Sequence, residues 1–264
     1  MKLHELTPHM ITEGGQVFKT PEGAPKTRRI HMSELPATLE WLSHITDLPV
    51  ADNVLGSVGK KITHGDIDVA VDENEISKDQ LVQKLSSWAK SEGYEARDHV
   101  KKSGVSVHFL TPIEGDPDQG WVQTDFMFTQ NITWMKFSMH SAGDASAYSG
   151  ADRNLLMSSL AKAQGLKYSW QKGLLRREDE QVISQDPDQI ARTLLGPRVD
   201  HTVFNSVEQM QEVIHKNSSL LNKFKELVAQ LESGQDAQGE PLKPGDVRKN
   251  QAEAERIRRL LSMS

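Results

Sequence analysis

Residues 56–69 read Gly56-Ser57-Val58-Gly59-Lys60-Lys61-Ile62-Thr63-His64-Gly65-Asp66-Ile67-Asp68-Val69. The Gly-Ser turn at the start leaves backbone N–H groups available to bind phosphate, with a hydroxyl beside them. Near the end, Asp66 and Asp68 alternate with apolar residues, as in a strand with two unlike faces, so both carboxylates point to one face. Two carboxylates at one place require positive charge, which divalent cations supply. The segment therefore predicts a phosphate loop followed by a metal-binding strand.

A third acidic residue is expected on a neighbouring strand. Residues 121–128 alternate as a strand, and Asp125 is the single acid among them. Three carboxylates from two neighbouring strands can hold two hard cations about 3.5–4 Å apart. We therefore predict that Asp66, Asp68 and Asp125 are catalytic and bind two Mg²⁺ or Mn²⁺ ions. An Asp-x-Asp alone is most often solvated surface or a turn, so the prediction depends on the combination.

Composition limits the classes of function. The chain has 264 residues, enough for one large or two small domains, and a net charge of −6. It has no cysteine, which excludes thiolate zinc sites and a cysteine nucleophile. We find no secretion signal and no apolar run of about 18 residues, so we expect a cytoplasmic protein without a membrane partner. The acidic balance implies that any nucleic-acid contact is local, short or aided by a partner.

The first half of the chain predicts an α/β (α+β) fold. Its periodicity predicts, in order, a helix capped by Ser33 and running to Ile45, a strand at 66–71, a helix from Ser77 to Gly93, and strands at 105–109 and 121–128. This order suggests a small mixed sheet with helices packed on it.

The second half predicts a helical C-terminal region. Helices are expected at 152–165, at 186–195, over a long amphipathic segment from Asn205 to Leu227, and at 246–262 after a linker at 233–246. The last helix is rich in arginine. It could contact phosphate, or it could be a solvated helix with Glu–Arg pairs.

The aspartate pattern resembles the polymerase-β-like nucleotidyltransferase superfamily. That signature is a Gly-Ser turn, a short interval, an acid-hydrophobic-acid-hydrophobic strand and a third acid on a later strand. Residues 148–154 read Tyr-Ser-Gly-Ala-Asp-Arg-Asn and residues 160–167 read Leu-Ala-Lys-Ala-Gln-Gly-Leu-Lys. They resemble family X DNA polymerases, in which an aromatic-Ser/Thr-Gly turn precedes an Asn-led helix. The resemblance covers about residues 54–197 and extends to nucleotidyltransferases of tailed bacteriophages, which would act in the host cytoplasm.

The resemblance implies a domain organisation. We predict an N-terminal arm at 1–30, a nucleotidyltransferase palm at 31–147, a nucleotide-binding helical segment at 148–200 and a C-terminal helical region at 201–264.

The resemblance also extends the site beyond the three aspartates. The expected nucleotide-binding residues are Gly56, Ser57, Lys60, Lys61, Tyr148, Gly150 and Asn154. Lys60 and Lys61 could bind the β- and γ-phosphates, or they could be ordinary solvated lysines. The turn at Tyr148 and Gly150 would pack on the sugar and Asn154 would contact the base. The alternatives are a loop aromatic and a polar residue at a helix start.

The chain also departs from the family pattern. About 50 residues precede the Gly-Ser turn, too few for the template-binding and lyase modules, so templated gap filling is not expected. The Ser57-to-Asp66 interval is one residue short, and Ser158 stands where the family has arginine.

These observations predict transfer of a nucleoside monophosphate from an NTP or dNTP to a hydroxyl, first a nucleic-acid 3′ end, with release of pyrophosphate. Transfer to a protein or small molecule, and a catalytically silent binding protein, remain open alternatives. The sequence does not predict the oligomeric state.

Overall fold

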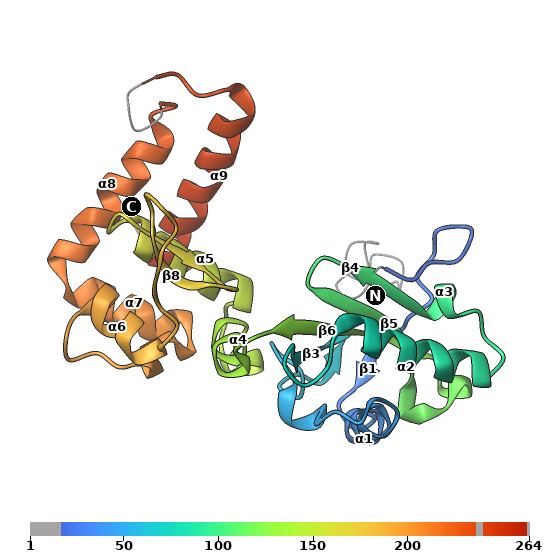
Figure 1. The fold of residues 1–264 in the computed structure, drawn as a ribbon. Helices are drawn as coiled ribbons and strands as arrows, with labels where there is room; N and C mark the ends of the chain where they lie inside the picture. The colour runs from blue at the N-terminus through green and yellow to red at the C-terminus, as the bar shows by residue number, and fades with distance from the viewer. Residues whose placement is uncertain (1–16, 236–239, 263–264) are drawn as a thin grey trace, which may run out of the picture. The chain divides into compact units, whose positions relative to one another are not determined.

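A computed structural model of the chain describes residues 17–235 and 240–262. The first sixteen residues, about half of the predicted arm, and residues 236–239 of the predicted linker lie outside the described residues. The chain forms two compact units, Met1–Lys136 and Phe137–Ser264, and each is described by itself (Figure 1).

The first unit is built on a four-stranded mixed sheet. Its strands are β3 (Asp66–Asp72), β4 (Val100–Ser103), β5 (Ser106–Pro112) and β6 (Trp121–Thr129). Their order in the sheet is β3-β6-β5-β4; β3 and β6 run parallel and the other neighbours run antiparallel. The predicted strands at 66–71, 105–109 and 121–128 and the mixed sheet are thus confirmed.

The edge strand β4 was not predicted. It follows the short helix α3 (Ala96–His99) and turns back into β5 through Gly104, whose φ is +51°. Three of its four residues are exposed, so β4 lacks the alternation of a half-buried strand. A second ladder pairs β1 (Ile30–His31) with β2 (Thr63–His64).

Two helices cover one face of the sheet. Helix α2 (Lys78–Ser91) begins as predicted, because Ser77 and Gln80 form a reciprocal capping box. Helix α1 (Leu35–Thr46) exists, but the predicted cap at Ser33 is wrong. The N-cap residue is Glu34, and its carboxylate accepts from Arg28 Nη2 at 2.6 Å and from the His31 N–H at 2.7 Å instead of capping the helix.

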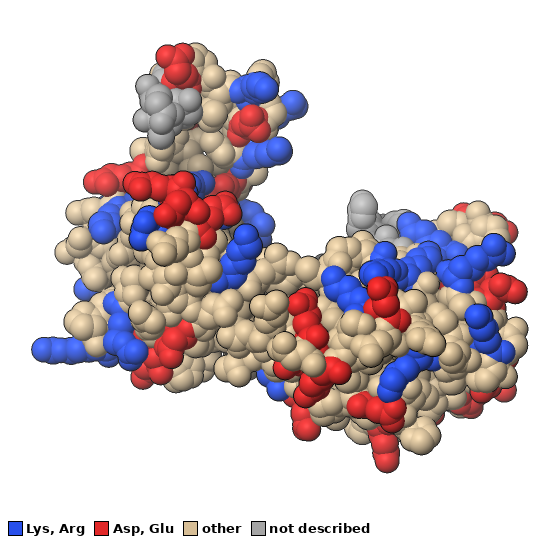
Figure 2. Space-filling view, viewed as in Figure 1, with Lys and Arg blue, Asp and Glu red and all other residues tan. Residues whose placement is uncertain are grey.

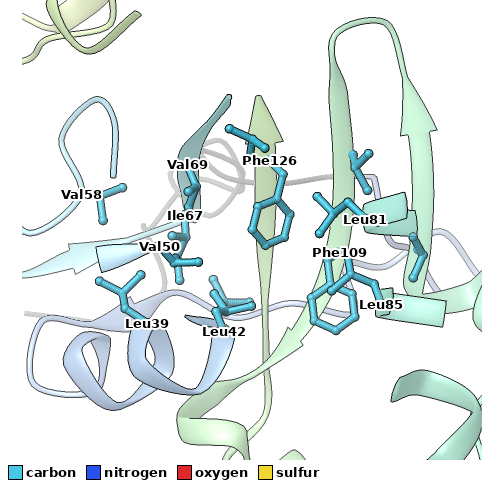
Figure 3. Packing of buried hydrophobic residues seen from close by; sticks show 14 of the residues in the cluster. Leu39, Leu42, Val50, Val58, Ile67, Val69, Leu81, Leu85, Phe109 and Phe126 are labelled. Carbon is cyan, nitrogen blue, oxygen red and sulfur yellow. The ribbon is translucent and has the colours of Figure 1, made fainter. Parts of the chain in front are cut away.

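The core lies between this sheet and these helices. Figure 3 shows side chains of β3, β5 and β6 pointing toward Leu39 and Leu42 of α1 and Leu81 and Leu85 of α2. At its centre lies the fully buried Phe109 ring. It stacks on the Trp41 ring with 6.3 Å between the ring centroids, and it packs edge-to-face with the Trp88 ring at a centroid distance of 5.3 Å. Because strand side chains alternate, the residues between these core positions point to the opposite face.

The second unit is mainly helical. Its helices are α5 (Gly150–Lys162), α6 (Pro187–Leu195), α7 (Val207–Lys216), α8 (Ser218–Glu232) and α9 (Pro244–Leu261). A three-stranded antiparallel sheet contains β7 (Leu166–Ser169), β8 (Gly173–Arg176) and β9 (Val182–Ser184). Helix α4 (Ile132–Ser138) spans the boundary between the units. Single 3₁₀ turns occur at Ala51–Asn53, Ile113–Gly115, Pro117–Gln119, Gly143–Ala145 and His201–Asn205.

The amphipathic segment predicted as one helix after Asn205 is two helices. The chain leaves helical geometry at Asn217, which has φ −113° and ψ 95°. The Asn217 side chain then accepts from the Leu220 N–H at 3.1 Å and caps α8. Apolar periodicity runs through this break, so periodicity alone did not reveal it.

Charges of both signs are spread over the surface. Figure 2 shows Lys and Arg side chains together with Asp and Glu side chains on the visible face of each unit. Across residues 17–235 and 240–262, no helix is long and apolar enough to cross a membrane.

We expect Phe109→Ala to lower the free energy of unfolding of the first unit by about 3–5 kcal/mol, because it removes a buried ring and leaves a cavity. Urea unfolding followed by tryptophan fluorescence measures the change. Ile62→Ala is the matched control, since Ile62 is 67% exposed in the same unit, and it should change stability by less than about 0.5 kcal/mol. Equal effects of the two substitutions would contradict the assigned core.

Candidate active site

The structure brings the three predicted aspartates together on one face of the sheet. In the parallel pairing of β3 with β6, Asp68 lies directly opposite Asp125 and Asp66 lies opposite Gln123. These residues alternate with Ile67, Val69 and the other core residues of β3 and β6, so they stand on the face away from α1 and α2. All three aspartates are half-buried.

The carboxylates repel one another. Burial, followed by the charges of Asp66 and Asp125, raises the pKa of Asp68 from 3.8 to about 7. A group of oxygen ligands with this excess of negative charge fits a hard divalent cation such as Mg²⁺. The side chains do not meet as a finished ligand set, since the described part of the chain has no three His, Asp or Glu side chains grouped to hold a metal ion.

The predicted phosphate loop is bonded to the same strand. The Leu55 N–H donates to the Asp68 carbonyl at 2.9 Å, and Val54 bridges Val69. The loop then turns through Gly56 and Gly59, whose φ values of +63° and +74° lie in the left-handed region that favours glycine. The loop is therefore attached to the strand that carries Asp66 and Asp68.

Buried His64 stabilises the loop through a hydrogen bond to the loop backbone. Its Nε2 accepts from the Gly59 N–H at 3.3 Å, and its ring is 3% exposed. A single histidine near a motif gives no sequence signal of function, because such a residue is most often structural. Here that structural role shapes the loop.

A polar cavity of about 260 Å³ lies between the loop and two of the aspartates, Asp66 and Asp68, and Asp125 does not line it. It is lined by Arg29, Ser57, Val58, Lys61, Thr63, His64, Gly65, Asp66 and Asp68. Of the predicted loop residues, Ser57 and Lys61 thus reach the cavity, whereas Gly56 precedes Ser57 in the turn and Lys60 is exposed.

A larger hollow of about 860 Å³ lies elsewhere on the first unit, beside the end of α1 and one side of α2. Its lysine, Lys84, already donates to Asp47 at 2.5 Å and to the Thr46 carbonyl at 3.0 Å. We place the candidate site in the smaller cavity, because the carboxylates and the phosphate loop meet there.

Arg29 was missed by the sequence analysis. Its guanidinium donates from Nε to Thr63 Oγ1 and from Nη2 to the Thr63 carbonyl, both at 3.0 Å, and it lines the cavity with the aspartates. No local signal marks Arg29, since its position depends on the pairing of β1 with β2 from a distant part of the chain.

The remaining predicted residues belong to the second unit. Ser149, in the Tyr148–Gly150 turn, caps α5 through a reciprocal bond with Asp152. The Tyr148 hydroxyl accepts from Gln211 Nε2 at 3.2 Å. Asn154 is half-buried and accepts from Arg153 Nη1 at 3.3 Å. The roles of Tyr148, Gly150 and Asn154 toward a nucleotide stay predictions.

Basic residues of the second unit are largely engaged within it. Arg153 is 2% exposed; it donates to the Ser138 carbonyl at 3.2 Å and lies over the Phe137 ring. In α9, Arg256 pairs with Asp152 at 2.9 Å, and Arg258 pairs with both carboxylate oxygens of Glu232. These contacts favour a packed, ion-paired helix over a phosphate clamp.

No protein-family model matches the sequence, and no curated protein matches it significantly.

The raised pKa of Asp68 predicts a pH-dependent stability. Between the unfolded value of 3.8 and the folded value of about 7, the folded protein binds more protons than the unfolded chain. Its free energy of unfolding therefore falls as pH rises through this window. Asp68→Asn removes this titrating group. With metal removed by EDTA, the variant should be only slightly more stable than wild type near pH 4, and more stable by as much as about 4 kcal/mol at pH 8. Urea unfolding at both pH values measures it, and a pH-independent difference would contradict the carboxylate cluster.

Proposed function

We propose that this protein is a metal-dependent nucleotidyltransferase of the polymerase-β type. The observation that carries the proposal is the register of β3 with β6, which sets three carboxylates on one sheet face. Two of them, Asp66 and Asp68, line a cavity together with Ser57 of the predicted phosphate loop. The reaction is attack of an acceptor hydroxyl on the α-phosphate of a nucleoside triphosphate. A new oxygen–phosphorus bond forms, the bond to the β-phosphate oxygen breaks, and pyrophosphate leaves.

Each part of the site has a distinct task in this proposal. Asp66, Asp68 and Asp125 would hold two Mg²⁺ ions, which neutralise charge on the phosphates when bound. Backbone N–H groups of the Gly56–Ser57 turn, with Lys61 and Arg29 in the same cavity, hold the triphosphate. Asp125, on the neighbouring strand β6, would also accept the proton of the attacking hydroxyl. Positioning and charge neutralisation supply most of the rate enhancement.

The preferred acceptor is a nucleic-acid 3′ end. The chain carries a net charge of −6 and its visible surface mixes both signs. A protein that follows long duplex DNA needs many phosphate contacts, whereas the end of a strand needs few. We therefore place the contact at a strand end, and a protein or small-molecule hydroxyl is the alternative acceptor.

We expect Asp66→Ala, Asp68→Ala and Asp125→Ala each to abolish nucleotide transfer, by at least about a thousandfold, while the protein stays folded. Removing one ligand destroys the metal site and relieves repulsion between carboxylates. Labelled NTPs and dNTPs with Mg²⁺ or Mn²⁺ are incubated with DNA, RNA, protein and small-molecule acceptors. Asp98→Ala, at an exposed position of the same unit, should keep wild-type activity. Near-normal transfer by any of the three variants would remove that residue from the site.

We also expect Mg²⁺ with a nucleoside triphosphate to raise the melting temperature more than Mg²⁺ alone. A ligand that binds the native state at a hundred times its Kd adds about 2.7 kcal/mol of stability. Lys61→Ala should reduce this shift, because Lys61 lines the cavity, whereas Lys90→Ala on the exposed side of α2 should not. Differential scanning fluorimetry measures the shift. Its absence with all eight common triphosphates at millimolar concentration would favour a binding protein without turnover.

A further inference from the structure

One oxygen of Asp125 is held by two donors. His108 Nδ1 lies 2.7 Å and Gln123 Nε2 lies 2.8 Å from Asp125 Oδ1. His108 stands directly opposite Asp125 in the antiparallel pairing of β5 with β6, and Gln123 precedes it by two residues on the same strand. All three side chains therefore share the sheet face of the other aspartates.

These bonds fix the direction of the carboxylate. When the Asp125 carboxylate is ionised it can only accept, and the His108 ring then donates from Nδ1. Two donors on one oxygen use both of its lone pairs and turn it toward β5. Oδ2 must then point away from both donors. Because β6 lies between β5 and β3, Asp68 stands on the other side of Asp125 from His108.

The orientation of Gln123 is itself determined. Its Oε1 accepts from the Val17 N–H at 3.0 Å. A backbone N–H can only donate, so the amide oxygen faces Val17 and the amide nitrogen faces Asp125. Lys101 Nζ donates to the Val17 carbonyl at 2.7 Å, and the next residue, Phe18, is 1% exposed. The chain at Val17 and Phe18 is thus anchored on this face of the sheet and holds the amide.

We propose that His108 and Gln123 are positioning residues that leave Asp125 with one oxygen, Oδ2, for a divalent cation. The proposal rests on the proposed function, because it takes Asp125 as a metal ligand. Carboxylates that bind metals are commonly held by such hydrogen bonds, and loss of one costs about 10–100-fold in metal affinity. Without the two donors, the Asp125 side chain can rotate and present either oxygen to the cation. Cation binding must then order the side chain, and this entropy cost weakens the affinity.

The test measures Mn²⁺ binding by calorimetry, with the full chain and without nucleotide. We expect His108→Phe, which keeps a ring but loses the donor, to weaken Mn²⁺ binding by about 10–100-fold. His108→Asn retains a donor near the position of Nδ1 and should lie within a few-fold of wild type. Gln123→Met should weaken binding in the same direction as His108→Phe. His44→Phe, at an exposed position on α1, is the matched control and should bind as wild type does.

A second measurement separates positioning from general damage. Transfer by His108→Phe should fall at low Mg²⁺ and recover toward wild type at high Mg²⁺, because the variant loses metal affinity and keeps the reacting groups. If His108→Phe does not fold, Gln123→Met and His108→Asn carry the test.

The outcomes distinguish the two proposals. Failure of the wild type to bind Mn²⁺, or equal binding by wild type and Asp125→Ala, overturns the proposed metal site itself. Binding that is lost in Asp125→Ala but unchanged in His108→Phe and Gln123→Met overturns the positioning proposal alone.

Discussion

The parallel register of β3 and β6 is the constraint on which the candidate site depends. It sets Asp68 directly against Asp125, so two like charges face each other across neighbouring strands. Opposed like charges destabilise a sheet. Burial makes the ionised form of Asp68 still more costly, so burial and the neighbouring charges together raise its pKa to about 7. A slip of one residue would separate the pair, but it would also turn Ile67 and Val69 out of the core. Burial of the apolar face therefore fixes a strand register that repulsion between the carboxylates disfavours.

That apolar face is stable because the two helices on it bury its side chains. Ile67 and Phe126 are fully buried, and the helices α1 and α2 pack against them (Figure 3). Burying a side chain of this size contributes roughly 1.5–3 kcal/mol. A few such residues outweigh the repulsion of one carboxylate pair, so the unit stays folded despite an unfavourable charge cluster.

Local signals in the sequence predicted the mixed sheet of the first unit and the strand positions of the aspartates in the candidate site. Asp66 and Asp68 alternate with core residues, and Ser77 with Gln80 forms the expected helix cap, because both signals involve neighbours in the chain. Strands β4 and β7–β9 were missed because each has at most four residues, too few for a periodic pattern. Arg29 and His108 were missed for another reason: their partners, Thr63 and Asp125, are set by strand pairing, which no local pattern encodes.

Charge in the cavity implies that metal and nucleotide bind together if the proposed function holds. Arg29 and Lys61 are the cationic side chains that line it, against Asp66 and Asp68, and a triphosphate would add further negative charge beside them. Two side-chain cations cannot neutralise the combined negative charge of the two carboxylates and the triphosphate. Divalent ions must therefore enter with the triphosphate. Linkage then requires that each ligand raise the affinity for the other by the same factor. The Leu55 N–H bonds to the Asp68 carbonyl, so the predicted phosphate loop is attached to the strand that carries two of the three proposed metal ligands.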